Sequence, residues 1–540
     1  MEGIQMIKVI VAEKIADEGL EILKKEFDVD FRPGIKQEEL LEIVENYDAL
    51  VVRSVIKVNE ELVARAKKLK VVGRAGVGVD NVTVPACTKR GILVINTPES
   101  NTISAAEHTI GLLLSAIRNI PRATAQLKSG GWDRNPFKGI ELYGKTVGIV
   151  GLGRIGSMVA TRLASFNMKV LAYDPYISDE RFRRFGAEKV DDLNELVRRV
   201  DVITVHTPRN EETMGIIGEE QFKIAKRGLV AVNCARGGII NEKALLQAIK
   251  DGIVSYAGVD VFEKEPSPGN PFFELEKIAV TPHCGADTDE AQVRVGLTIA
   301  NQLIKALNGE VVPNAVNLPS LREDELGTLS PYLCLAEKMG KFYFQVEKAP
   351  AERVEINYYG RVANTDTEMI TISFLKGLLQ PILGDEVNYV NAPLLAENRG
   401  IKLVVSKDEA PNGVGSGKEY ASLIEAKIFD SKGMLEISGT ISPKREPRLV
   451  SLRGYEMDIN PTGVMLFVLN VDRPGVIGPF TTILGQEGIN IAMMQVSRHQ
   501  KGDVALMTLN VDVEGETVGE DVVKKLRAVD GITTVKVVKF

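Results

Sequence analysis

The stretch TVGIVGLGRIGSMVATRL, residues 146–163, places Gly151, Gly153 and Gly156 at GxGxxG spacing between an apolar run and a helical pattern. In a strand-turn-helix unit the first glycine permits a tight turn and the second lets the backbone approach a pyrophosphate. The third allows the helix to pack closely on the strand. The helix N-terminus adds unpaired N–H groups and partial positive charge. The stretch therefore predicts a dinucleotide-binding unit.

Asp174 ends the next apolar run, 23 residues after Gly151. A carboxylate at this place accepts hydrogen bonds from ribose hydroxyls and repels a 2′-phosphate, so it favours NAD over NADP. An Asp before Pro175 can also simply initiate a turn. The agreement of glycines, strand, helix and carboxylate favours the nucleotide interpretation.

Short apolar runs alternate with helical patterns through about the first 315 residues, which is typical of parallel sheets built from βαβ units with right-handed crossovers. Continuous apolar runs indicate strands covered on both faces of the sheet. The expected strands are 8–13, 48–54, 70–76, 92–98, 146–153, 169–174, 201–206, 228–233, 256–260 and 278–283.

This region divides into two doubly wound, Rossmann-like domains, because the glycine motif appears only after a long helical pattern at 99–118. A second helical pattern near 288–308 is expected to return the chain to the first sheet. We therefore expect a substrate-binding domain of residues 1–98 plus 285–315 and an NAD-binding domain of residues 99–284. Ligands are expected between them, beyond the carboxyl ends of the strands.

Beyond about residue 315 the pattern changes to mixed strand and turn signals, which indicates a separate α+β intervening domain at 316–460. Residues 461–540 follow the order strand, helix, strand, strand, helix, strand. This is the βαββαβ order of the ferredoxin-like split motif. The fold class is thus α/β, with two smaller domains appended.

Composition limits the class of protein. A length of 540 residues fits three to four domains at roughly 150 each, and 44% hydrophobic with 26% charged residues is typical of globular chains. The net charge of -7 disfavours nucleic acid as a partner. The longest apolar stretch, about nine residues, is too short for a membrane span. We expect a cytoplasmic protein.

The cysteines are widely spaced and form no CxxC pair, so we expect reduced thiols, no disulfide framework and no metal site. The four residues are Cys87, Cys234, Cys284 and Cys334.

Three segments after the nucleotide unit carry candidate chemistry: 233–245, 258–266 and 281–288. His283 follows a predicted strand, and an imidazole ionises near neutral pH, so it suits a proton acceptor. Glu265 is placed to hydrogen-bond the ring and stabilise an imidazolium. Arg236 can bind a carboxylate bidentately. Each residue also has a structural alternative. His283 can be a packing histidine, Glu265 a turn residue before Pro266, and Arg236 a loop anchor.

The set GLGRIG, CARGGI, DVF..EP and TPHCGA resembles the D-isomer-specific 2-hydroxyacid dehydrogenase family over residues 7 to about 315. The resemblance implies Arg236, Glu265 and His283 as catalytic residues and NAD as cofactor. It implies cofactor contacts from Gly151, Gly153, Arg154, Ile155, Gly156, Asp174, Thr207, Cys234, Ala235, Arg236, Asp260, His283, Gly285 and Ala286.

The two domains after residue 315 restrict the resemblance to one branch of this dehydrogenase family. Segments 468–480 and 487–496 are similar to ACT domains, which bind amino acids. Segments 387–401 and 447–463 are similar to the intervening domain of long-form D-3-phosphoglycerate dehydrogenases. The resemblance implies oxidation of 3-phosphoglycerate to 3-phosphohydroxypyruvate, the first step of phosphorylated serine synthesis. It implies substrate contacts from Arg53, Ser54, Gly76, Asn101, Arg236 and His283.

The ACT resemblance also implies a regulator. Asn470, Asp472 and Asn490 match positions that bind L-serine in related enzymes, although some members have His and Asn at the first two places. A purely structural dimer interface is the alternative. The same resemblance makes a homotetramer plausible. A basic cluster in the intervening domain is a candidate anion site or a solvated face: Lys444, Arg445, Arg448 and Arg453.

The sequence departs from the family pattern at two positions. Val77 stands where the family often has Thr, and Asp287 makes the segment GADT where the family often has GAST. A side-chain contact is in doubt at each position. Two other functions stay open on sequence grounds. One is a different dehydrogenase of the family, acting on glyoxylate, hydroxypyruvate or D-lactate. The other is a non-catalytic NAD-sensing regulator on the same fold.

Overall fold

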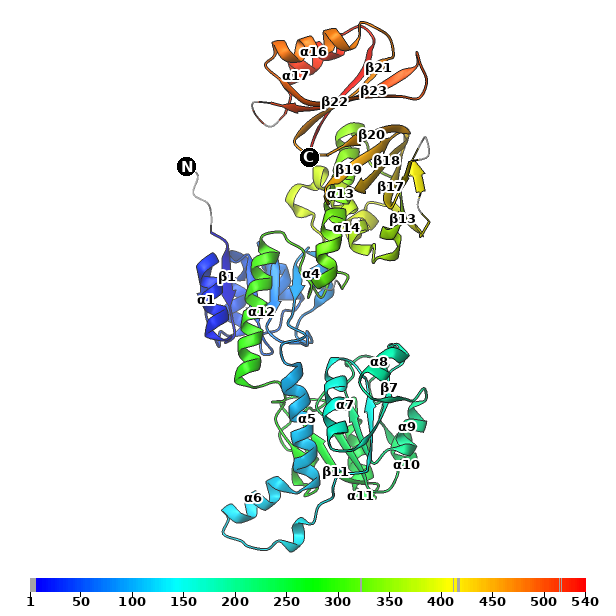
Figure 1. The fold of residues 1–540 in the computed structure, drawn as a ribbon. Helices are drawn as coiled ribbons and strands as arrows, with labels where there is room; N and C mark the ends of the chain where they lie inside the picture. The colour runs from blue at the N-terminus through cyan, green and yellow to red at the C-terminus, as the bar shows by residue number, and fades with distance from the viewer. Residues whose placement is uncertain (1–5, 321–322, 411, 415–417, 514, 516) are drawn as a thin grey trace.

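The computed structural model describes residues 6–320, 323–410, 412–414, 418–513, 515 and 517–540. Four main sheets follow one another along an elongated molecule, with the ACT sheet at one end and the NAD-binding sheet at the other (Figure 1). Within the described residues no helix is both long and apolar enough to cross a membrane. The four cysteines are free thiols.

The first sheet is parallel, in the order β2-β1-β3-β4-β5. Its strands are β1 (Lys8–Val11), β2 (Asp28–Phe31), β3 (Ala49–Val52), β4 (Val71–Arg74) and β5 (Leu93–Ile95). The connecting helices are α1 (Asp17–Glu26), α2 (Gln37–Ile43), α3 (Glu60–Arg65) and α4 (Val84–Lys89). The four strands expected here are present; β2, short and largely exposed, was not predicted.

The second sheet is also parallel, in the order β12-β11-β10-β9-β6-β7-β8. Its strands are β6 (Thr146–Val150), β7 (Lys169–Tyr173), β8 (Glu188–Lys189), β9 (Val202–Val205), β10 (Leu229–Asn233), β11 (Val254–Val259) and β12 (Ile278–Val280). Its helices include α7 (Arg154–Ser165), α8 (Asp179–Arg184), α9 (Leu193–Arg199), α10 (Glu219–Ile224) and α11 (Glu242–Lys250). The Rossmann-like prediction is confirmed.

Two helices carry the chain between these sheets. Helix α5 (Thr102–Ile117) leads into the second sheet, and α12 (Asp289–Leu307) returns to pack on α1. Helices α12 and α1 pack closely at Gly19, where an added Cβ would lie only 2.3 Å from the carbonyl oxygen of Gly296. The crossings are tied by Ser104 Oγ and Thr288 Oγ1 at 2.8 Å. We propose that the domain limits fall at these crossings, as the sequence suggested.

The intervening region holds more helix than the sequence predicted. It opens with α13 (Glu323–Glu347) and later contains α14 (Glu368–Leu383) and α15 (Ala392–Asn398). The expectation of mixed strand and turn signals missed α13 and α14 because both contain residues that usually break helices, including Pro331 and Pro381.

Its glycines instead serve helix packing. A Cβ on Gly340 would lie 2.2 Å from the Phe374 carbonyl oxygen, and one on Gly377 would lie 2.0 Å from that of Glu337. The two helices therefore touch backbone to backbone. They cover a six-stranded sheet in the order β14-β13-β17-β18-β19-β20, beside the hairpin β15-β16. The strands are β13 (Arg353–Gly360), β14 (Lys402–Asp408), β15 (Asn412–Val414), β16 (Lys418–Tyr420), β17 (Ser422–Asp430), β18 (Gly433–Ile441), β19 (Pro447–Leu452) and β20 (Tyr455–Ile459).

The last unit confirms the predicted βαββαβ order, with an antiparallel sheet β22-β23-β21-β24. Its elements are β21 (Val464–Val471), α16 (Ile477–Gln486), β22 (Asn490–Arg498), β23 (Val504–Asp512), α17 (Glu520–Arg527) and β24 (Ile532–Lys539). One face of this sheet packs on α13, where Phe342 meets Phe467 with ring centroids 4.7 Å apart.

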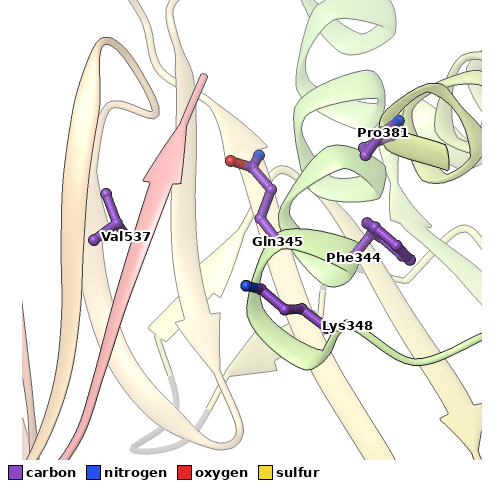
Figure 2. Close-up of a pocket in the computed structure, with 5 residues that line it drawn as sticks. All are labelled: Phe344, Gln345, Lys348, Pro381 and Val537. Atoms are coloured by element: carbon purple, nitrogen blue, oxygen red, sulfur yellow. The ribbon is translucent and has the colours of Figure 1, made fainter. Parts of the chain in front are cut away.

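A hollow of about 470 Å³ lies at this junction, between α13, α14 and β24 (Figure 2). Its lining is Phe344, Gln345, Lys348, Pro381 and Val537. Gln345 crosses the junction by exchanging hydrogen bonds of 2.9 and 3.0 Å with the backbone of Lys539. None of the predicted site residues lines this hollow, so it belongs to the domain junction.

We predict that Gly377→Ala destabilises the intervening domain by about 1–3 kcal/mol, because its methyl group would overlap the Glu337 carbonyl oxygen. Chemical denaturation measures the change. Gly327→Ala on α13 is the matched control, since a Cβ there meets open space and gains helix propensity. Equal stability of the two variants would contradict the close helix contact.

Candidate active site

The predicted catalytic, cofactor and substrate residues lie where the carboxyl ends of the two parallel sheets approach each other. From the first sheet, the turn after β4 reaches Arg236 of the second domain. A Cβ on Gly78 would lie 2.6 Å from Arg236 Nη2, and Asp80 Oδ2 lies 3.8 Å from Arg236 Nε. Gly78 thus permits a close approach between the domains.

The glycine motif has the geometry that the sequence predicted. Gly151 has φ +90°, and a Cβ there would lie 2.8 Å from the His206 carbonyl oxygen. A Cβ on Gly156 would lie 2.0 Å from the Gly151 oxygen, so the third glycine permits the helix to pack. Around Gly153, the N-cap of α7, a Cβ would meet nothing within 4 Å. Space for an anion thus opens at the helix N-terminus.

Buried polar atoms beside this turn support a bound nucleotide. Thr207 Oγ1 is buried and has no hydrogen-bond partner among the described residues. His206 Nδ1 beside it is also without one, and burial lowers the pKa of His206 to about 4. Because buried polar groups are normally satisfied, Thr207 is available to a ligand. These residues fit a dinucleotide in the NAD site.

Two predicted cofactor residues already have protein partners. Asp174 accepts hydrogen bonds of 2.9 Å from Leu152 N–H and 3.0 Å from Tyr176 N–H, one on each oxygen. The first bond ties the carboxylate to the glycine turn, and each oxygen keeps a second lone pair for ribose. Arg154 pairs with Glu99 at 3.0 Å. The Arg154 side chain therefore links the crossing segment to α7.

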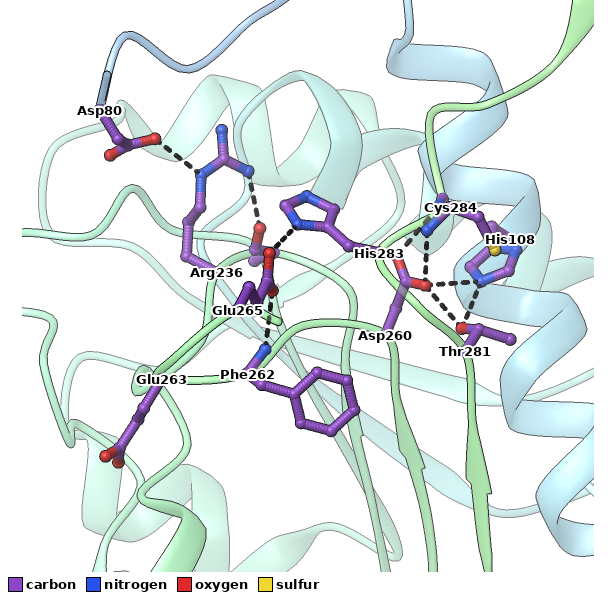
Figure 3. A network of polar contacts seen from close by, with 12 residues as sticks. Asp80, His108, Arg236, Asp260, Phe262, Glu263, Glu265, Thr281, His283 and Cys284 are labelled. Carbon is purple, nitrogen blue, oxygen red and sulfur yellow. Dashed lines mark hydrogen bonds and ion pairs between the residues drawn. The ribbon is translucent and has the colours of Figure 1, made fainter. Parts of the chain in front are cut away.

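His283 and Glu265 form the pair that the sequence predicted. His283 Nδ1 lies 2.6 Å from Glu265 Oε2, and Glu265 Oε1 accepts the Phe262 N–H at 2.9 Å (Figure 3). Burial would raise the pKa of Glu265, but the bonds from His283 and Phe262 outweigh it, so the pKa lies below its ordinary value. An ionised carboxylate only accepts, so Nδ1 carries the proton and Nε2 is left with the lone pair of a base.

Arg236 lies beside this pair, with Asp80 reaching toward it from the first domain (Figure 3). One arm is fixed by a bond of 2.7 Å from Nη1 to the Ala235 carbonyl oxygen. The remaining guanidinium donors are positioned to bind a carboxylate next to His283.

Asp260 organises the turn that carries His283. Its buried carboxylate accepts bonds from Thr281 Oγ1 (2.6 Å), Cys284 N–H (3.0 Å) and Gly285 N–H (2.9 Å), and its backbone oxygen accepts His283 N–H at 2.8 Å. His283 itself has φ +54°, an uncommon conformation outside glycine. The Asp260 carboxylate thus mainly stabilises the turn. A cofactor that contacts Asp260 directly would have to use oxygens that already accept these hydrogen bonds.

His108 on α5 completes this network, with Nε2 3.0 Å from Thr281 Oγ1 and 3.3 Å from Asp260 Oδ1. Burial would raise the pKa of Asp260, but bonds from His108, Thr281 and the backbone hold the pKa below its ordinary value. Ligand-type atoms of His108, Asp260 and Cys284 lie within 4.8 Å of one another. The hydrogen bonds of Asp260 account for this cluster without a metal ion.

Two predicted substrate residues, Arg53 and Ser54, lie on the loop after β3. Glu13 accepts the N–H groups of Arg53 (2.8 Å), Ser54 (3.2 Å), Val55 (3.1 Å) and Ile56 (3.1 Å). Asn81 Nδ2 binds the carbonyl oxygens of Arg53 (3.0 Å) and Ile56 (2.6 Å) from the other side. The loop that carries two predicted substrate residues is therefore fixed before any ligand binds.

The remaining substrate residues stand nearby on the same sheet edge. Gly76, with φ +148°, follows β4, and Asn101 is the N-cap of α5. At the two departures the backbone still organises the turns: the Val77 carbonyl oxygen accepts Asn96 Nδ2 at 2.6 Å, and Asp287 N–H donates to Cys284 at 2.9 Å. Asp287 Oδ1 also accepts Gln292 Nε2 at 3.0 Å.

The three predicted effector residues do not meet within one chain. Asn470 pairs across the sheet with Ala505, while Asn490 pairs with Asp512, seven residues further along β23. That is roughly 24 Å at about 3.4 Å per residue. Asn470 is buried with Oδ1 unpartnered, whereas Asp472 binds Arg498 at 2.9 Å. The three residues therefore do not form one site within a single chain.

The basic cluster of the intervening domain is largely paired. Arg448 binds Asp458 at 2.7 Å, Arg453 binds Glu347 at 2.5 Å, and Arg445 donates to the Gly327 carbonyl oxygen. These partners favour the solvated-face interpretation over an anion site.

Four residues of the site were absent from the predicted set: Glu13, Arg74, Asp80 and His108. Glu13, Arg74 and Asp80 follow or end apolar runs of the first sheet, the positions where ligand-binding residues gather in parallel sheets. His108 gave no signal, because its role depends on how α5 crosses the second sheet.

Family models match three parts of the chain. Residues 110–285 match the D-isomer specific 2-hydroxyacid dehydrogenase NAD binding domain, 328–453 the D-3-phosphoglycerate dehydrogenase intervening domain, and 464–531 the ACT domain. The chain is 45% identical to a D-3-phosphoglycerate dehydrogenase of Methanocaldococcus jannaschii, over 99% of this chain and 100% of the relative. It is 39% identical to one of Bacillus subtilis, over 99% of both.

Solved structures match a little over half of the chain. The TT0316 protein of Thermus thermophilus is 32% identical, with a TM-score of 0.54, over 57% of this chain and 100% of its own. A glyoxylate reductase of Paecilomyes thermophila is 29% identical, with a TM-score of 0.54, over 58% and 99%. The chain is therefore similar over this share of its length to a glyoxylate reductase as well as to the TT0316 protein.

We predict that Asp260→Asn destabilises the NAD-binding domain by about 2–4 kcal/mol near neutral pH, because a buried carboxylate loses charge-assisted hydrogen bonds. Since the folded-state pKa of Asp260 lies below its ordinary value, this stabilisation is fully present above about pH 4 and is lost as the pH falls through the folded-state pKa. Denaturation at several pH values checks this. A stability difference that does not shrink as the pH falls below about 4 would contradict this role of the Asp260 carboxylate.

Proposed function

The chain belongs to the D-isomer-specific 2-hydroxyacid dehydrogenase family, in its D-3-phosphoglycerate dehydrogenase branch, and from this we propose that it oxidises 3-phosphoglycerate to 3-phosphohydroxypyruvate with reduction of NAD. The reaction begins phosphorylated L-serine synthesis. The observation that carries the proposal is the His283–Glu265 pair at 2.6 Å, next to Arg236 and at the strand edge that holds the glycine turn.

In the proposed reaction, Arg236 binds the substrate carboxylate and orients the carbon that bears the hydroxyl group. His283 Nε2 takes the hydroxyl proton as the carbonyl forms, and Glu265 stabilises the resulting imidazolium through Nδ1. The cofactor, when bound, supplies the hydride acceptor. The backbone at Gly153 and the N-terminus of α7 would hold its pyrophosphate, Gly151 and Gly156 would shape the turn for it, Asp174 would bind the ribose, and Thr207 would lie nearby.

The other predicted cofactor positions support the same site. Ile155 lies in the first turn of α7, while Cys234, Ala235, Gly285 and Ala286 follow β10 and β12 at the carboxyl edge. Arg53, Ser54, Gly76 and Asn101 face this edge from the first domain and would bind the rest of the substrate. Closure of the two domains would exclude water.

The direct test measures the formation of NADH by its absorbance with 3-phosphoglycerate as substrate. The same assay is run in parallel with glycerate and with lactate, which lack the phosphate. We expect turnover with the phosphorylated acid. His283→Ala should lower turnover by about 10²–10⁴-fold, the usual loss of a general acid-base, with little change in NAD affinity. His499→Ala, far from the cleft, is the control. A fully active His283→Ala would remove the imidazole from its role, and a chain inactive on every acid would favour a regulator.

We also propose a homotetramer. An arm formed by α6 (Ile120–Lys128) and the following loop projects from the NAD-binding domain (Figure 1), with Trp132 89% exposed. On the ACT unit, the edge strand β22 exposes Met493 and Val496. Exposed apolar surfaces of this kind mark association sites, and two separate twofold contacts would generate four copies.

Pairing of β22 edges between two ACT units would bring Asn490 of one copy toward Asn470 and Asp472 of the other, and we propose L-serine as the ligand held between them. Asn490→Ala should then abolish inhibition by serine, while the molecular mass of the oligomer in solution stays unchanged. Gel filtration and inhibition curves check this, with Gln486→Ala as the exposed control. Undiminished inhibition in Asn490→Ala would contradict the effector site.

A further inference from the structure

Strand β14 (Lys402–Asp408) is an edge of the six-stranded sheet in the intervening domain. Among the described residues it pairs only with β13, and all seven of its residues are exposed. Three consecutive apolar residues lie on it: Leu403, Val404 and Val405 have 41%, 50% and 41% of their surface exposed. An exposed edge strand is a template for pairing with another strand.

The outer side of β14 carries hydrogen-bonding groups of its own. Lys402 N–H donates to the Glu352 carbonyl oxygen at 2.9 Å, on the side of β13. Backbone groups alternate in direction along a strand, so those of residues 402, 404, 406 and 408 face β13. The N–H and carbonyl groups of Leu403, Val405 and Lys407 therefore point away from the sheet.

We propose that β14 pairs antiparallel with β14 of a second copy of this chain, about a twofold axis at Val405. Val405 then lies opposite its own copy, and Leu403 lies opposite Lys407. Lys402 lies opposite Asp408, once on each side of the axis. The residues whose backbone groups point outward thus face one another, as hydrogen-bonded antiparallel pairs require. The two six-stranded sheets would join edge to edge.

Charge complementarity selects this register. Opposite charges directly across an antiparallel pair stabilise it, and Lys402 and Asp408 would form such a pair twice. Across the described ranges Lys402 Nζ has no hydrogen bond or ion pair. Asp408 Oδ1 accepts the Ala410 N–H at 3.0 Å, which leaves Oδ2 for the second copy. Each charge therefore has capacity for a partner from outside the chain.

Other antiparallel registers lose this match. A register shift keeps the side chains on their faces only if it moves the pairing by two residues. One such shift would place Lys402 opposite Ser406, and the other would place Asp408 opposite Val404. Charged residues on an edge usually prevent pairing, but here they favour one partner and one register.

The remaining cation of the strand does not oppose the pairing. Lys407 Nζ donates to the Thr365 carbonyl oxygen of its own chain at 3.1 Å. Its aliphatic stem can therefore lie against Leu403 of the second copy while the ammonium keeps a polar partner.

A strand pair of this length buries little surface, so we expect it to strengthen an assembly that other contacts also hold. A tetramer with D2 symmetry has three twofold axes. The contacts proposed above for the α6 arm and for the β22 edge use two of them, and β14 would supply the contact on the third.

Disulfide trapping tests the position of the axis. Val405→Cys should give a disulfide-linked dimer under mild oxidation, because Cα atoms of a hydrogen-bonded antiparallel pair lie about 5.5 Å apart, within disulfide range. Leu403→Cys is the matched control, with the same exposed fraction of 41%. Its two copies would be four residues out of step, about 14 Å apart, and should not link.

Both variants carry Cys334→Ser, since Cys334 is an exposed thiol, and non-reducing electrophoresis measures the linked dimer. Equal linking of the two variants would overturn the proposal, and so would the absence of a dimer in Val405→Cys.

Charge reversal in the Val405→Cys chain tests the register. Lys402→Asp or Asp408→Lys places like charges opposite each other and should slow disulfide formation about fivefold or more. The double variant restores opposite charges at unchanged net charge and should restore the rate, and high salt should reduce all these differences. Single variants that link at the original rate, or a double variant as slow as the single ones, would overturn the pairing.

Discussion

The hydrogen bonds to the buried carboxylate of Asp260 fix the turn that presents His283, and the arrangement of the site depends on them. Strand β11 supplies the carboxylate, the segment after β12 supplies two N–H groups and Thr281, and α5 supplies His108. Three elements are thereby joined at one buried anion. Because His283 has a positive φ, the turn needs such support to keep the imidazole directed at Glu265.

The same principle organises the opposite side of the cleft. Glu13 uses its carboxylate to fix the backbone of the Arg53 loop, and Gly76 and Gly78 leave room for the guanidinium groups of Arg74 and Arg236. Acidic side chains thus shape both rims, while the arginines remain for an anionic ligand. The parallel strands of both sheets end toward this space, so substrate and nucleotide would meet where backbone N–H groups and cations gather.

Much of this could be predicted from the sequence. The spacing of apolar residues and the glycine motif were sufficient to predict both parallel sheets, the glycine turn and the ACT topology, because each of these features depends on local sequence patterns. Arg236, Glu265 and His283 were candidates from the chemistry of the segments that follow the nucleotide unit, and the family resemblance supported them; their geometry agrees with the proposed roles. Helices α13 and α14 were missed because Gly340 and Gly377 act in packing, which only the partner helix reveals. Glu13 and His108 were missed because their partners are distant in sequence. Asn388 on the intervening domain, bound to the Gly91 carbonyl oxygen at 2.8 Å, is a further contact of this kind.

We propose that the imidazole of His283 and the guanidinium of Arg236 act together on a single hydroxy acid between the two sheets. A crystal structure with NAD and 3-phosphoglycerate bound tests it most directly. The account predicts the substrate hydroxyl within about 2.6–3.2 Å of His283 Nε2, with the carboxylate on Arg236. A substrate hydroxyl directed at another group, or a carboxylate bound away from Arg236, would contradict it.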